Sequence, residues 1–106
     1  MAAAHPPDET KLTADRLTSS LDAVTNLLAA ARDAEAFVAA IEANGVVWRE
    51  ILDLAPVLGW RVPDEMARFS MSMAARAGRG ISDHEVETLM RLNRALVVEI
   101  SANRAC

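Results

Sequence analysis

The chain contains few of the side chains that catalytic and metal sites require. Its 106 residues include one cysteine, two histidines and no tyrosine. Cys106 is the last residue and has no second cysteine to pair with, and no cysteine–histidine spacing typical of a zinc site occurs. Gly78-Arg79-Gly80 lacks the preceding strand and the lysine of a phosphate-binding loop. We therefore expect no catalytic residue, no cofactor, no metal ion and no enzymatic activity.

Long apolar runs are also absent. No stretch approaches the roughly 20 apolar residues that a membrane helix needs. The N-terminal MAAAHPPDET lacks the charged start and the apolar core of a signal peptide. The net charge of −4 provides no general attraction for nucleic acid or anionic lipid. These absences predict a cytoplasmic protein that binds neither membranes nor nucleic acid.

The composition that remains favours helices. Hydrophobic residues make up 52% of the chain, and only four glycines and four prolines interrupt it. Alanine, leucine, methionine, arginine and glutamate are good helix formers, and a chain of this length suffices for one core but not for two. We predict an all-α fold, a single small bundle of about four helices over residues 12–104, preceded by a disordered tail over residues 1–11.

The first half of the chain predicts two helices. One begins near Thr13 or slightly earlier, and the other covers residues 33–54. Asp33 either caps the second helix or lies in a bend of one continuous helix. Gly45, which costs about 1 kcal/mol in a helix interior, marks either a close helix crossing or a break, and we prefer the uninterrupted helix. Pro56 is expected to end it, because the residue before a proline disfavours helical geometry. The apolar stripes consist of Leu17, Leu21, Val24, Leu28 and Ala31, then Phe37, Ile41, Trp48, Leu52 and Ala55.

The second half predicts two more helices, joined by a glycine-containing turn. Pro63 followed by Asp64 and Glu65 is typical of a helix start, and Ser82 with Glu85 forms a capping box at the start of the last helix. The glycines between them end the third helix. The residues expected to face inward are Met66, Phe69, Met73, Ala77, Val86, Leu89, Met90, Leu96, Val97 and Ile100.

Two asparagines interrupt the apolar stripes. Asn93 lies within LMRLNRALVVEI, where a leucine would cost less to bury, and Asn44 lies four residues before Trp48. A buried amide without a partner costs about 1–3 kcal/mol, so both side chains should be hydrogen-bonded to each other, to backbone carbonyls or to a loop amide. We interpret Asn44 and Asn93 as a structural polar pair that specifies how the second and fourth helices meet, in preference to a direct ligand contact.

The connection after the second predicted helix is unusually apolar. Residues 56–62, PVLGWRV, must pack either on the domain itself or on a partner. Val57, Leu58 and Trp60 in this connection are candidate partner-binding residues, together with Met71, which falls off the main face of the third helix. Methionine adapts to irregular partners. The alternative for Trp60 is a lid over the core of its own domain.

The order of these features resembles the FlaF family of flagellar biosynthesis regulators of alphaproteobacteria. The resemblance spans roughly residues 17–101 and depends on Asn44-Gly-Val-Val-Trp48, on Val62-Pro63 where family members have leucine-proline, and on Leu92-Asn93-Arg94. It implies a small, non-enzymatic helical protein that acts with the regulator FlbT on flagellin expression, binds flagellin and assists its secretion. A bundle of this size can hold an amphipathic flagellin helix in an apolar groove.

Two other functions remain open. The heptad-like stripe of the first helix would suit a self-associating adaptor of another pathway, which would form a homo-oligomer. Residues 63–100 also superficially resemble a helix-turn-helix. The base-reading end of its second helix would then carry Asp83, His84, Glu85 and Glu87, whose carboxylates repel phosphates. DNA binding is therefore the least favoured of the three functions.

Overall fold

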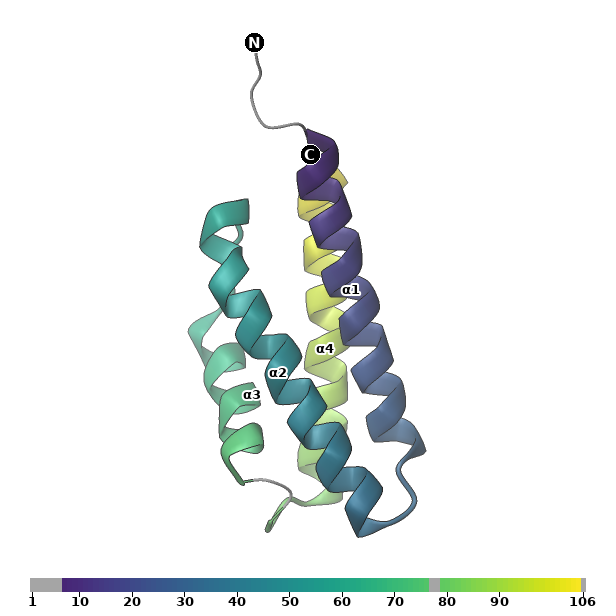
Figure 1. The fold of residues 1–106 in the computed structure, drawn as a ribbon. Coiled ribbons are helices and arrows are strands. Elements are labelled where there is room, and N and C mark those ends of the chain that lie inside the picture. Colours follow the sequence, from purple (N-terminus) through teal and green to yellow (C-terminus); the bar gives the residue numbers. More distant parts are fainter. Residues whose placement is uncertain (1–6, 77–78, 106) are drawn as a thin grey trace.

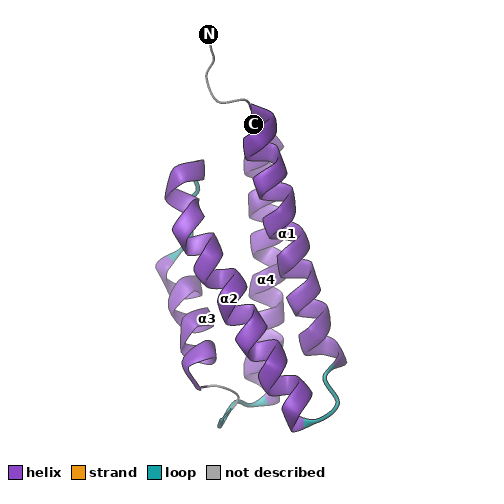
Figure 2. Cartoon of the chain, in the orientation of Figure 1, coloured by secondary structure: helices purple, strands orange, loops and turns teal. Residues whose placement is uncertain are grey.

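The computed structural model describes residues 7–76 and 79–105, and within these residues it contains four helices and no strand (Figure 2). The helices are α1 (Pro7–Ala30), α2 (Ala34–Leu58), α3 (Asp64–Arg76) and α4 (Asp83–Ala105). Successive helices run in opposite directions along the bundle (Figure 1). The predicted all-α bundle is confirmed.

The four helices do not contact one another equally. α1 packs along both α2 and α4, and α2 packs along α3. α2 and α4 lie diagonally, and in the described residues no Cα atom of one comes within 8 Å of a Cα atom of the other. α3 touches α4 only weakly. At the end that holds both termini, α1 and α4 extend beyond α2 and α3 (Figure 1). The bundle is therefore least tightly closed between α3 and α4.

The helix boundaries differ from the predicted ones in the first half of the chain. α1 begins at Pro7, earlier than expected, because a proline at the first helical position loses no intrahelical hydrogen bond. Residues 1–6, the rest of the predicted tail, lie outside the described residues, as does Ala77. α1 and α2 are separate helices, since Asp33 adopts an extended backbone and its carboxylate accepts a hydrogen bond of 2.8 Å from the Ala36 N–H.

The prediction that Pro56 ends the second helix is wrong. α2 continues to Leu58, and Gly59 then adopts a left-handed backbone with φ of 78°. The Trp60 N–H donates to the Ala55 carbonyl at 2.8 Å and the Gly59 N–H donates to the Pro56 carbonyl at 3.3 Å, which is a Schellman motif. A proline within the last turn removes one intrahelical hydrogen bond, and this double cap offsets the loss.

Gly45 marks a close helix crossing within an uninterrupted α2. A Cβ atom added at Gly45 would lie 2.7 Å from the Cβ atom of Ala74 in α3. Any larger residue at Gly45 would therefore push the two helices apart. The small residues Gly45 and Ala74 allow the backbones of α2 and α3 to approach each other.

The core consists of two hydrophobic clusters. The first cluster surrounds Trp48 and lies toward the end with the termini. The second cluster surrounds Ile41 and Met73 and lies near the opposite end. Most residues of the predicted stripes face inward. Leu52, however, is only partly buried and joins neither cluster, whereas Ile51, which lies outside the stripes, is fully buried. α2 contacts α1 and α3 on different sides, so it buries more than one stripe. The buried apolar residues of the clusters are Ala14, Leu17, Leu21, Trp48, Ile51, Leu96 and Ile100, and Leu28, Ala40, Ile41, Met73 and Leu89.

Candidate functional site

The two asparagines that interrupt the apolar stripes meet in the centre of the bundle. The Asn93 amide donates to Asn44 Oδ1 at 2.8 Å and to Thr25 Oγ1 at 3.1 Å, and Asn93 Oδ1 accepts the indole N–H of Trp48 at 2.8 Å. Thr25 in turn donates to the Leu21 carbonyl at 2.7 Å. We call Thr25, Asn44, Trp48 and Asn93 the amide network. All four side chains are at least 94% buried.

The amide network connects α1, α2 and α4 through side chains alone. Trp48 and Asn44 lie one turn apart on α2, and both reach across the diagonal to Asn93 on α4. Because the backbones of these two helices stay apart, the long indole and the two amides span the distance. The network therefore specifies the register of three helices. The sequence predicts Asn44 and Asn93 as a polar pair, but it indicates Trp48 only as a core residue and gives no sign of Thr25. A threonine on an amphipathic helix gives no signal of its own, since its hydroxyl can also bond to its own helix.

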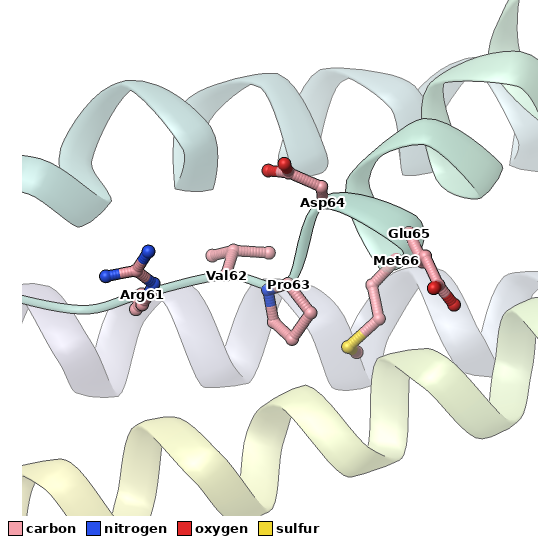
Figure 3. Close-up of a pocket in the computed structure, with 6 residues that line it drawn as sticks. All are labelled: Arg61, Val62, Pro63, Asp64, Glu65 and Met66. Atoms are coloured by element: carbon pink, nitrogen blue, oxygen red, sulfur yellow. The ribbon is translucent and has the colours of Figure 1, made fainter.

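A groove opens between α3 and α4 where these helices contact each other least. Its α3 side consists of Pro63 and Met66, and in Figure 3 both of these side chains extend toward α4. Its α4 side consists of Ala95, Leu96 and Val98, and the groove encloses about 430 Å³. Arg61 and Glu99 flank it with opposite charges. We call this depression the α3–α4 groove; it suits an apolar segment with charged flanks.

None of the four residues predicted to bind a partner lines this groove. Val57 is 80% exposed on the last turn of α2. Leu58, Trp60 and Met71 are partly buried and pack against the first hydrophobic cluster. Trp60 thus covers the core of its own domain, and its place in the Schellman motif brings it there.

The sequence does not predict the α3–α4 groove, because its apolar pattern indicates Met66 and Leu96 as core residues. Leu96 is indeed 97% buried, but Met66 is only partly buried. Val98 is 68% exposed. The one available signal was the run Leu96-Val97-Val98, which contains more consecutive apolar residues than one face of a helix can bury.

One ion pair closes the turn between α3 and α4. Arg76 binds both carboxylate oxygens of Glu85, at 2.7 and 3.0 Å, and also donates to the carbonyl oxygens of Arg79 and Gly80. Glu85 accepts the Ser82 N–H at 3.0 Å, and the Ser82 hydroxyl accepts the Glu85 N–H, so the predicted capping box is confirmed. The hydrogen bonds from Arg76, followed by that from Ser82, lower the pKa of Glu85 to about 2.

Within residues 7–76 and 79–105 the structure contains no group of three or more histidine, cysteine, aspartate or glutamate side chains that could hold a metal ion. Nor does any helix in that part of the chain combine the length and the apolarity needed to cross a membrane. Comparison of the chain with models of known families, with curated proteins and with solved structures finds no match.

Proposed function

We propose that the protein is a non-enzymatic, FlaF-like regulator that binds flagellin and controls its synthesis or secretion. The observation that carries the proposal is the convergence of Asn44, Trp48 and Asn93 in one buried network. These residues belong to two of the three motifs on which the resemblance to the FlaF family depends. Their convergence supplies a physical reason for them to occur together: the network sets the helix register on which a binding surface is built.

The α3–α4 groove is the surface that we propose for flagellin. Amphipathic helices bind in apolar grooves by placing residues three and four positions apart into them. On α4, Val98 at 68% exposure provides an apolar contact, and the Arg61 and Glu99 flanks would orient the charged edges of a bound helix. Flagellin held in this way stays unassembled in the cytoplasm, where we place the complex. An FlbT-like regulator is the second partner that the proposal includes.

The test is a titration of the purified full-length chain with purified flagellin, followed by calorimetry. We expect Val98→Asp to weaken binding at least tenfold, because it places a charge on the α4 wall of the apolar groove. Val46→Asp is the matched control, since Val46 is 60% exposed on the middle of α2 and outside the groove. Absence of binding by the wild-type chain would refute the proposal, and equal loss for Val46→Asp would refute the groove as the surface.

The same preparation separates the other two functions. Sedimentation that shows a tight dimer without affinity for flagellin would favour a self-associating adaptor. Salt-dependent retention on DNA would favour a helix-turn-helix protein. Against DNA binding, α3 packs on α2 and only weakly on α4, and Asp83, His84 and Glu87 at the start of α4 are exposed.

A further inference from the structure

Helix α3 is the shortest of the four helices, packs mainly on α2 and buries few side chains completely. Its 13 residues include two fully buried side chains, Ser70 and Met73, whereas α2 has seven buried residues. Ser70 is completely buried and its hydroxyl has no hydrogen-bond partner. A buried hydroxyl without a partner opposes the docked position, because it loses its hydrogen bonds to water. One of the two side chains that α3 buries fully therefore opposes its docking.

The other three helices are connected independently of α3. Each of the four members of the amide network belongs to α1, α2 or α4. α3 is attached by the Gly45–Ala74 crossing and by the ion pair of Arg76 with Glu85 beside the turn. Its apolar side chains also pack on both clusters, Met66 and Met71 on the first and Phe69 and Met73 on or within the second. Departure of α3 would leave every hydrogen bond of the amide network intact.

We propose that α3 is a displaceable cover over the flagellin-binding surface, and that it opens along the α3–α4 groove. The groove is then the open edge of a longer site that continues beneath α3 to Gly45. In the free protein α3 occupies this site, and in the complex a helix of the partner replaces it. The identity of the partner rests on the proposed function, whereas the opening of α3 does not.

The contacts of α3 define the helix that can take its place. Ala74 meets Gly45 of α2, and Ser70 lies one turn earlier on the same face. Each is preceded by a large apolar residue that packs on or within the second cluster, Phe69 and Met73. The partner is therefore an amphipathic helix with two small residues four positions apart, each directly after a large apolar residue. Close approach to Gly45 excludes a large side chain at the position of the partner helix that corresponds to Ala74.

The opening of α3 is tested by hydrogen exchange on the free full-length chain. We expect α3 amides to exchange at least tenfold faster than central amides of α1, α2 and α4, since local opening precedes global unfolding. Ser70→Ala should slow the exchange of α3 by roughly 5- to 100-fold, because it removes the unpaired hydroxyl. Ala74→Leu should accelerate it by at least tenfold, because the larger side chain meets the α2 backbone. Ser72→Ala, exposed on the same helix, is the matched control for helix propensity and should slow exchange only about twofold.

Flagellin affinity provides the second readout. If α3 must leave for flagellin to bind, Ser70→Ala weakens binding and Ala74→Leu strengthens it by factors similar to those seen in exchange. Wild-type binding that neither substitution changes would refute displacement while the proposed function stands. Failure of the wild-type chain to bind flagellin would refute the proposed function and the displacement by flagellin together, and exchange alone would then decide whether α3 opens. If the amides of α3 exchange at the same rate as those of the other helices, the opening of α3 is refuted whether or not flagellin binds. Unchanged exchange of the α1 amides in Ala74→Leu verifies that this variant is folded.

Discussion

Replacing Asn93 with alanine removes the residue at which the amide network converges. The indole N–H of Trp48 and the Oδ1 atom of Asn44 then lose their partner, whereas the Thr25 hydroxyl keeps its bond to the Leu21 carbonyl. Each buried group left without a partner costs about 1–3 kcal/mol, and the space left by the carboxamide adds about 1 kcal/mol. We therefore expect a loss of about 3–7 kcal/mol in the free energy of unfolding, a large part of the 5–15 kcal/mol typical of a domain.

The assay is urea unfolding of the wild-type chain and of Asn93→Ala, followed by far-ultraviolet circular dichroism. Asn26→Ala is the matched control, because Asn26 is exposed on α1 and its replacement should change stability by less than about 0.5 kcal/mol. A loss below about 1 kcal/mol for Asn93→Ala, with an unchanged denaturant slope, would show that the network does not hold the helices together. A variant that melts normally but no longer binds flagellin would make Asn93 a contact residue instead.

Asn93→Asp distinguishes a buried charge from a lost hydrogen bond. One carboxylate oxygen would still accept the Trp48 N–H, but the other would face Asn44 Oδ1, an acceptor against an acceptor. Burial disfavours the charged form, so the pKa of the new carboxyl is raised in the folded state. Stability is then greatest below the unfolded pKa of about 3.9 and falls as pH rises through the raised value. We expect Asn93→Asp to be less stable than Asn93→Ala at pH 7 and to recover in acid, and a deficit independent of pH would contradict this reasoning.

Two further predictions concern the α2–α3 crossing and the turn before α4. Gly45→Ala should lower the free energy of unfolding by about 1–2 kcal/mol, because the overlap with Ala74 costs more than the gain of about 1 kcal/mol in helix propensity. Urea unfolding measures this loss. A Gly45→Ala variant more stable than wild type, or a double variant Gly45→Ala/Ala74→Gly that does not recover stability, would contradict the close crossing. For Glu85, the folded pKa of about 2 lies below the ordinary 4.5, so its contribution to stability is complete above about pH 5 and is lost as pH falls toward 2. Melting temperatures between pH 6 and pH 2.5 should therefore fall less steeply for Glu85→Gln than for wild type, and parallel curves would show that the ion pair does not perturb this carboxyl.

Local features of the fold could be predicted because their causes lie within a few residues. The capping box of Ser82 and Glu85 and the cap at Asp33 each satisfy helix N–H groups three residues away. The Schellman motif at Gly59 is equally local, since a glycine followed by an apolar residue favours it, and it outweighs the helix-ending tendency of Pro56. A proline near the C-terminal end of a helix costs too little to end it when such a cap follows.

The candidate site could be predicted only in part. That Asn44 and Asn93 need partners follows from the cost of burying an amide, but the choice of Trp48 and Thr25 does not. The α3–α4 groove was not anticipated, because periodicity shows which face of a helix is apolar but not how closely two helices approach.

Sequence alone determined that this chain forms amphipathic helices, where most of them begin and that two amides lie among apolar residues, because propensity, capping and periodicity act between near neighbours. Only the tertiary structure decided that α2 and α4 face each other across a diagonal, that Gly45 meets Ala74 and that α3 leaves an edge open beside α4. These features join residues far apart in the chain, and the packing of whole helix surfaces selects among the arrangements that the same local pattern allows.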